Sequence, residues 1–133
     1  MNIVILGCGR VGALFATMMD REGHAVSIID LNNDAFQRLP AEFGGSIFVG
    51  NGVDEDVLIR AGIQEADVFA ALTNGDNRNI MAAQIAREIF HVNKVICRIY
   101  DPMREETYRE LGLETFCPTQ VGAQILHDAV LAQ

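Results

Sequence analysis

The sequence predicts a single α/β domain of the Rossmann type, with a doubly wound, parallel, six-stranded sheet in the order 3-2-1-4-5-6. Two observations predict this fold. The chain opens with an apolar run that ends in a glycine-rich turn at residues 7–12, and a second apolar run ends in an acid, Asp30. Apolar runs and helical patterns then alternate along the chain. Its 133 residues suffice for one continuous core but not for a nucleotide domain with a full substrate domain.

The first thirty residues predict a βαβ unit. A strand over 2–6 leads into the sequence Gly7-Cys8-Gly9-Arg10-Val11-Gly12 and a helix that Gly23 ends. Gly7 allows a tight turn, Gly9 removes a side chain where a phosphate approaches the backbone, and Gly12 lets the helix pack closely. The N-terminus of this helix offers free N–H groups to an anion. An apolar stripe at helical spacing, which we expect to lie on the sheet, comprises Val11, Leu14, Phe15 and Met18.

The later elements repeat this alternation. After the second strand, Asn32 or Asn33 can cap a short helix that Pro40 limits, and a third strand covers 46–49. The further elements are a helix from the cap Asp54 to Gly62, a strand at 68–72, a turn and cap at 74–76 before a helix, a strand at 95–99, a helix from Pro102 to Gly112, a short strand at 115–117, and a last helix that Thr119 caps. Gly122, Ile125, Leu126 and Ala129 form one stripe of that last helix.

Composition excludes several classes of function. Ten basic and eighteen acidic residues give a formal net charge of −8, which argues against a nucleic-acid partner. The chain has no signal-peptide pattern and no apolar run of the roughly 20 residues that a membrane-spanning helix needs, so we expect a cytoplasmic protein without direct membrane insertion. Three cysteines without Cys-x-x-Cys spacing predict neither a disulfide scaffold nor a metal site.

Polar residues gather at the carboxyl ends of the predicted strands, where open α/β sheets bind ligands. They are the glycine turn, Asp30, Asn51, Thr73 with Asn74, and Arg98. Asp30 is placed either to accept hydrogen bonds from a ribose diol or to cap the following helix, and its charge disfavours the 2′-phosphate of NADP. Arg98 follows a buried strand and needs an anionic partner.

Two residues of the glycine turn leave alternatives open. Cys8 is either a redox thiol at a helix N-terminus or a small residue that fits between two glycines. Arg10 is either a solvated first-turn residue or a phosphate clamp. The three histidines, His24, His91 and His127, are not expected at the binding edge, so we predict no catalytic residue.

The chain resembles the N-terminal RCK domain (regulator of K⁺ conductance), also called the KTN or TrkA-N domain, over essentially its whole length. The resemblance rests on the glycine turn with Asp30, then on later features that generic dehydrogenase domains lack. These are Gly50-Asn51-Gly52 with Asp54 and Leu58, Ala66-Asp67, Thr73 with Asp76 and Asn79-Ile80, Arg98 with Pro102, and Gly112 and Pro118. Two departures are Asn51, where the family usually has Asp, and Asn77, where an acid often follows Asp76.

This resemblance implies a nucleotide sensor that binds ATP, ADP, AMP or NAD(H) and gates a membrane potassium channel, transporter or cation antiporter. It implies that residues 7–12 hold the phosphates of the nucleotide, that Asp30 holds the ribose, and that Asn51, Gly52 and Val53 hold the adenine. Thr73 and Asn74 would form the far wall of the binding cleft. Arg10 and Arg98 would hold the terminal phosphate or a second nucleotide. Leu31, Gly75 and Asn79 complete the predicted set of binding residues. Residues 119–132 resemble the helix that crosses between subunits of a homodimer, which often assembles further into a ring.

Two further alternatives remain open beside this family resemblance. The chain ends where a C-terminal RCK subdomain often follows, so it is either a single-domain member or a piece of a longer protein. The rival function is an NAD-dependent oxidoreductase or its isolated cofactor domain, which would need an acid–base residue at the carboxyl edge.

Overall fold

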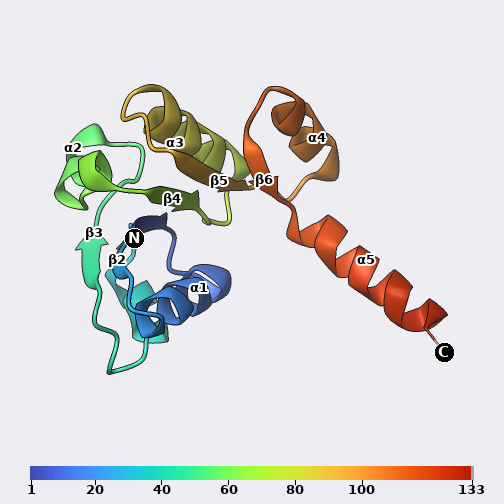
Figure 1. The fold of residues 1–133 in the computed structure, drawn as a ribbon, viewed down its shortest axis with the longest axis horizontal. Coiled ribbons are helices and arrows are strands. Elements are labelled where there is room, and N and C mark those ends of the chain that lie inside the picture. The colour runs from blue at the N-terminus through green and yellow to red at the C-terminus, as the bar shows by residue number, and fades with distance from the viewer. Residues whose placement is uncertain (133) are drawn as a thin grey trace.

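The computed structural model describes residues 1–132 and contains the predicted parallel sheet, with the strand order β3-β2-β1-β4-β5-β6 (Figure 1). The strands are β1 (Asn2–Leu6), β2 (Ala25–Asp30), β3 (Ser46–Val49), β4 (Val68–Ala71), β5 (Lys94–Arg98) and β6 (Glu114–Phe116). The helices are α1 (Arg10–Arg21), α2 (Glu55–Arg60), α3 (Asp76–Glu88), α4 (Pro102–Glu110) and α5 (Pro118–Leu131), with 3₁₀ helices η1 (Asn33–Arg38) and η2 (Ile63–Glu65). The sequence predicted all of these elements except η2.

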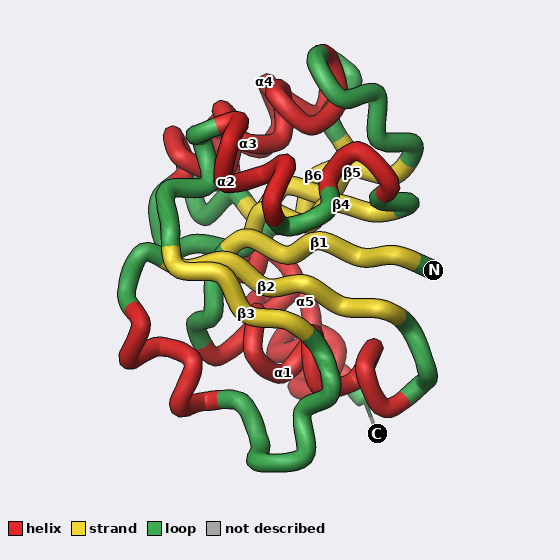
Figure 2. Tube along the Cα trace, turned by 90° about the vertical axis from the view of Figure 1, so that its left-hand side faces the viewer, coloured by secondary structure: helices red, strands yellow, loops and turns green. Residues whose placement is uncertain are grey.

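Alternation along the strands divides the core between two faces of the sheet. In β1, Val4 and Leu6 pack with residues of α2 and α3, whereas Ile3 and Ile5 pack with residues of α1 and η1. All four side chains are nearly inaccessible to water, which is typical of a central parallel strand. Figure 2 shows the strands as a layer between these two groups of helices.

The prediction for the face of α1 was correct only in part. The buried residues of this helix are small, namely Gly12, Ala13, Ala16 and Thr17. Of the predicted stripe, Val11 and Phe15 only partly pack against the core, and Leu14 and Met18 are 63% and 53% exposed. The cause is a close approach, because a Cβ on Gly12 would lie 1.9 Å from the carbonyl oxygen of Gly7. Only small side chains fit beneath a helix at this distance.

The capping predictions were mostly confirmed. The side chains of Asn32 and Asp54 cap η1 and α2 by accepting backbone N–H bonds, and Pro102 occupies the first turn of α4. The prediction for Thr119 was wrong, since α5 begins at Pro118 after Cys117, and the Thr119 hydroxyl instead donates to the carbonyl of Tyr100.

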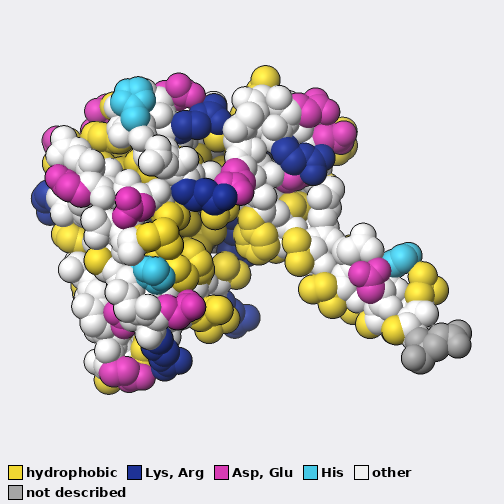
Figure 3. All heavy atoms as spheres, in the orientation of Figure 1, with side chains coloured by type: hydrophobic (Ala, Val, Ile, Leu, Met, Phe, Trp, Pro, Cys, Tyr) yellow, Lys and Arg dark blue, Asp and Glu magenta, His cyan; other side chains and the backbone are white. Residues whose placement is uncertain are grey.

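Helix α5 extends away from the rest of the domain (Figure 1). It has no buried residue, and five of its apolar side chains are 46–80% exposed: Val121, Ile125, Leu126, Val130 and Leu131. Figure 3 shows hydrophobic side chains along its length. Among residues 1–132, the core cluster on the α1 side includes residues of β1, β2 and β4 but none of β5 or β6. Ile96 and Phe116 of those two strands are only half-buried. Within the same residues, no helix is both long and apolar enough to cross a membrane.

Candidate functional site

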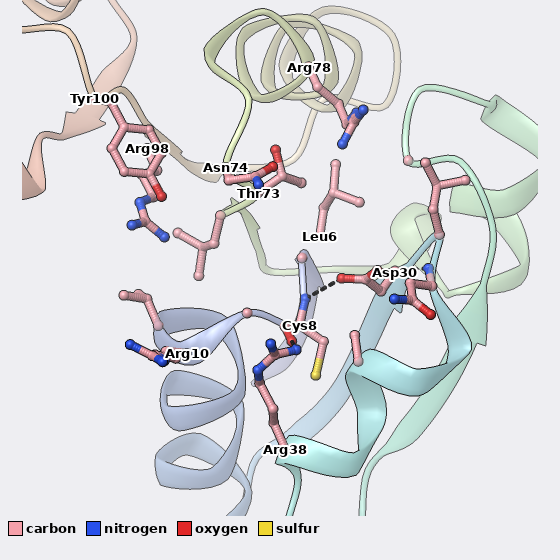
Figure 4. Close-up of a pocket in the computed structure, with 18 residues that line it drawn as sticks. Leu6, Cys8, Arg10, Asp30, Arg38, Thr73, Asn74, Arg78, Arg98 and Tyr100 are labelled. Carbon is pink, nitrogen blue, oxygen red and sulfur yellow. Dashed lines mark hydrogen bonds between the residues drawn. The ribbon is translucent and has the colours of Figure 1, made fainter.

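A hollow of about 400 Å³ lies at the carboxyl edge of the sheet (Figure 4). Its walls come from the turn after β1, the end of β2, the segment after β4 and the end of β5, which are the places where the sequence predicted a site. Eleven predicted binding residues line it: Gly7, Cys8, Gly9, Arg10, Val11, Asp30, Leu31, Gly52, Thr73, Asn74 and Arg98.

The glycine turn shapes the floor of this hollow. Gly7 has a φ of +107°, and a Cβ there would lie 2.8 Å from the backbone nitrogen of Thr73, so only glycine fits. At Gly9, by contrast, a Cβ would meet nothing within 4 Å. Gly9 is also the N-cap of α1, which has no side-chain cap and no acid in its first turn. The first amides of α1 therefore have no side-chain capping partner among the described residues, and they lie at the positive end of the helix dipole.

Asp30 anchors the glycine turn to the second strand. Its Oδ2 accepts a hydrogen bond from the Cys8 N–H at 2.8 Å, and its Oδ1 accepts one from the Asn32 N–H at 2.9 Å (Figure 4). The alternative role as a helix cap is wrong, because Asn32 caps η1 by accepting from Asp34 N–H. Each carboxylate oxygen keeps a further lone pair for a hydroxyl donor.

The hollow is strongly basic for a chain with a formal net charge of −8. Four arginines, Arg10, Arg38, Arg78 and Arg98, surround it, and Asp30 is the one acid among its lining residues (Figure 4). Arg38 donates to the Cys8 carbonyl at 3.3 Å. Arg98 lies over the ring of Tyr100, 4.2 Å from its centroid, and its buried Nε has no hydrogen-bond partner among the described residues. This charge balance favours an anionic ligand.

Burial and charge at Cys8 argue against the redox role that the sequence left open. It is fully buried, and burial, followed by the nearby charge of Asp30, raises its pKa from the usual 9.0 to about 11, although Arg38 acts in the opposite direction. Burial, and secondarily Asp76, raises the pKa of Cys97 to about 12. A thiol of raised pKa holds little nucleophilic thiolate at neutral pH.

We therefore expect the native protein to resist iodoacetamide at pH 7.5, with Cys8 and Cys97 alkylated at least about tenfold more slowly than in the urea-denatured chain. Because both pKa values are raised only in the folded state, stability is expected to fall as pH rises from about 9 towards 11. Mass spectrometry of timed samples measures the first effect, and denaturation at stepped pH measures the second. Rapid native labelling of Cys8 at pH 7.5 would restore the redox interpretation.

Asn79 supports the site from beneath, although the sequence predicted it as a binding residue. It is fully buried, and its Oδ1 accepts from the backbone N–H and the hydroxyl of Thr73 at 2.9 and 2.6 Å. Its Nδ2 donates to the carbonyls of Thr73 and Arg98, both at 2.9 Å. All its hydrogen-bonding capacity thus joins the ends of β4 and β5, which leaves none for a ligand.

Four further predicted residues do not line the hollow. Gly12 packs under the glycine turn, and Gly75 is the N-cap of α3. Asn51 is exposed and accepts from the Val53 N–H at 3.1 Å, so its side chain closes its own turn. Of the segment predicted to hold adenine, Gly52 reaches the hollow but Asn51 and Val53 do not.

Sequence reasoning missed seven lining residues: Leu6, Asn32, Ala35, Arg38, Leu72, Arg78 and Tyr100. Some carried a signal, because Leu6, Asn32 and Leu72 adjoin predicted site residues in the chain and Tyr100 is two residues from Arg98. Arg38 and Arg78 carried none, since they lie within helices and reach the hollow only through long side chains. None of the three histidines lines it; His24 meets the N-terminus, and His127 lies on α5.

The strand order, the glycine turn and the acid at the end of β2 define the class of Rossmann-type domains with a dinucleotide-binding fingerprint. The family model of the TrkA-N domain matches residues 3–118. The chain therefore belongs to the TrkA-N domain family, as the resemblance indicated.

Two curated relatives share this domain. The chain is 51% identical over 115 residues to the Trk system potassium uptake protein TrkA of Streptomyces coelicolor, covering 86% of this chain and 52% of that protein. It is 38% identical over 111 residues to a TrkA homologue of Pyrococcus abyssi, covering 84% and 49%. The chain thus spans about half the length of these relatives.

Solved structures share the fold. The TrkA-N domain of the Escherichia coli inner membrane protein ybaL has a TM-score of 0.83 and 19% identity, covering 98% of this chain and 96% of that one. The Shewanella denitrificans Kef CTD in its AMP-bound form has a TM-score of 0.82 and 21% identity, covering 98% and 80%. The GsuK channel bound to NAD has a TM-score of 0.80 and 24% identity, covering 96% and 22%.

Proposed function

We propose that this chain is a cytoplasmic, non-catalytic regulatory domain that binds an adenine nucleotide, either AMP, ADP, ATP or NAD(H), and gates potassium transport through a membrane partner. The observation that carries the proposal is a basic hollow over an uncapped helix N-terminus and the open side of Gly9. The structural neighbours bound to AMP and NAD, and the curated relatives that are potassium uptake proteins, support this choice.

The phosphates would lie over Gly9 and the first turn of α1. Backbone N–H groups there need acceptors, and a phosphate oxygen both accepts hydrogen bonds and favours the positive end of the helix dipole. Arg10 and Arg98 both line the hollow and would bind a second or third phosphate (Figure 4). The unpartnered Nε of Arg98 lies in the same wall.

The ribose would lie against Asp30. The carboxylate is held in place by two backbone N–H groups, so it is oriented before any ligand arrives. A ribose diol donates two hydrogen bonds to such a group, whereas a 2′-phosphate brings a second negative charge to it. NADP is therefore disfavoured, although Arg38 lies in the same part of the hollow.

Catalysis has little support from the lining residues. A hydride-transfer enzyme acting on a carbonyl needs a proton donor or acceptor near the reacting atom. The titratable candidates in the wall are Asp30, which two amides hold, the Cys8 thiol, whose pKa is raised to about 11, and Tyr100. Sustained NADH oxidation with a small carbonyl substrate, lost on changing one of these residues, would favour the oxidoreductase instead.

The conformational response to nucleotide binding would pass through α5 to a second copy of the chain. The apolar residues of α5 within the proposed crossover segment 119–132 are exposed to water. On the α1 side of the sheet, β5 and β6 contribute no residue to the buried core cluster. A helix from a second copy would fill that face, and exchange of the two helices would give a symmetric dimer. Such dimers could assemble into a ring on a potassium channel, a transporter or a cation antiporter.

Calorimetric titration with AMP, ADP, ATP, NAD⁺, NADH and NADP⁺ tests the proposal directly. The proposal fails if none of the adenine nucleotides binds. Mass spectrometry of the supernatant from freshly purified, denatured protein then identifies the nucleotide that the protein carries. Capture of a membrane partner by the full-length protein separates the channel from the antiporter.

Replacing Arg98 with alanine is expected to weaken ADP and ATP binding about 10- to 100-fold but AMP binding by no more than about threefold. The reason is that a hydrogen bond to a charged group contributes about 1.5–3 kcal/mol, and Arg98 lies where a second or third phosphate would lie. Arg60→Ala, on the exposed surface of α2, is the matched control for loss of one positive charge. An equal loss for all three nucleotides contradicts the phosphate role of Arg98.

A further inference from the structure

Tyr100 forms part of two hollows at the binding edge. Its side chain lines the main hollow and also a shallower neighbouring one, where the other lining residues are Asn74, Asp76 and Arg104. The guanidinium of Arg98 lies 4.2 Å from the centroid of its ring, a cation–π contact that couples the two side chains (Figure 4). Any ligand that binds Arg98 therefore also acts on the ring of Tyr100.

The backbone of Tyr100 connects this wall to two helices. Its N–H donates to Asp76 Oδ1 at 2.8 Å, in the first turn of α3. Its carbonyl accepts a hydrogen bond from the Thr119 hydroxyl at 3.0 Å and a weaker one from the Cys117 thiol at 3.7 Å. Both of these donors lie at the start of α5.

The hydrogen bonds from Thr119 and Cys117 to the Tyr100 carbonyl matter because the rest of α5 does not pack against the core of its own chain. No residue of this helix is buried, so its direction depends on the junction with β6 and on the contacts at its base. A 14-residue helix is about 21 Å long, and a rotation of about 5° at the base moves the far end by about 2 Å. Small changes at Tyr100 are thus enlarged along α5.

We propose that Tyr100 is a positioning residue that transmits nucleotide occupancy of the main hollow to the direction of α5. The proposal rests on the proposed function, because it needs a phosphate-bearing ligand near Arg98. When such a ligand draws the Arg98 guanidinium towards it, the stacked ring moves with the guanidinium. The Tyr100 carbonyl then shifts the Thr119 hydroxyl, to which it is hydrogen-bonded, and with it the first turn of α5. The ligand shifts α5 to the extent that it binds one orientation more tightly than the other.

Thr119→Val tests this link without touching the hollow. Valine keeps the shape of threonine but removes the hydroxyl donor, and Thr119 is not a lining residue of either hollow. Thr119→Ser restores the donor. Thr107→Val is the matched control, because the Thr107 hydroxyl donates at 3.2 Å to the Met103 carbonyl within α4, away from α5.

Each protein is titrated with ADP, and with NADH in parallel, and its amide hydrogen exchange is followed with and without the nucleotide. We expect the nucleotide Kd to agree within about threefold across all four proteins. In the wild type, Thr119→Ser and Thr107→Val, nucleotide should change exchange in the first two turns of α5 at least about threefold. In Thr119→Val this response should be lost.

The outcomes separate the two proposals. Absence of any binding to the wild type refutes the proposed function, and the link with it. Binding with no change of exchange in α5 of the wild type refutes the link alone. A full α5 response in Thr119→Val also refutes it, since α5 would then sense the ligand by another route. Loss of the response in Thr119→Val, with rescue by Thr119→Ser, supports it.

Discussion

Replacing Gly12 by alanine is expected to destabilise the domain by about 3 kcal/mol, which corresponds to a Tm about 10 °C lower. A Cβ at this position would lie 1.9 Å from the Gly7 carbonyl oxygen and 3.0 Å from the Gly7 carbonyl carbon. These are backbone atoms, so no flexible side chain can move aside. Either α1 must lift from the turn or the turn must change shape, and both displace Ala13 and Ala16 from the core. Differential scanning calorimetry measures the effect.

Two alanine substitutions at other glycines serve as controls. At Gly9, a Cβ would meet nothing within 4 Å and φ is −79°, so Gly9→Ala should fold with nearly wild-type stability but bind phosphate-bearing ligands more weakly. At Gly122, in the exposed α5, alanine also meets nothing and should stabilise the helix by about 0.5–1 kcal/mol. Similar melting temperatures for Gly12→Ala and Gly9→Ala would show that the close approach of α1 is not required.

Asp30→Ala is expected to have the largest effect on binding, a loss of about 100-fold in affinity for NAD⁺ and AMP. It removes the acceptor for the ribose and leaves the N–H groups of Cys8 and Asn32 without their partner. The glycine turn then loses its tie to β2 at the place where it must hold phosphates. Calorimetric titration gives the affinities, and a parallel thermal melt gives the cost in stability.

The charge of Asp30 also predicts a change in selectivity. NADP⁺ should lose less than about tenfold in the same variant, because removing the carboxylate relieves its repulsion of the 2′-phosphate. Asp34→Ala is the control, since it removes a carboxylate from η1 at a residue that does not line the hollow. Equal losses for NAD⁺ and NADP⁺ would argue that Asp30 holds the turn but does not contact the ribose.

The fold was predictable because its determinants are local in the sequence. The glycine turn, the side-chain caps at Asn32 and Asp54, and the apolar strands each carry a pattern that needs no tertiary information. The face of α1 was only partly predicted because its orientation depends on a backbone contact between Gly12 and Gly7, which no hydrophobic pattern records. The larger apolar side chains of α1 suggested a face that includes Leu14 and Met18, which the structure leaves exposed.

The candidate site was predictable to the extent that strand ends determine it. Asp30 and Arg98 end strands, Thr73 follows one closely, and all three reach the hollow as expected. Asn79 and Arg38 show the limit of this reasoning. Asn79 carries the family pattern yet is fully used in holding two strand ends together, and Arg38 reaches the hollow from a helix end that has no local signal. Side-chain reach and burial decide such cases, and both depend on the folded chain.

The uncovered helix α5 has a consequence for how the protein unfolds. A helix of 14 residues is marginal in water on its own, so its order depends on whatever covers its apolar side. If a second copy provides that cover, dilution should melt α5 while the six-stranded sheet, whose core lies within one chain, remains folded. The same chain would then show two transitions, one that depends on protein concentration and one that does not.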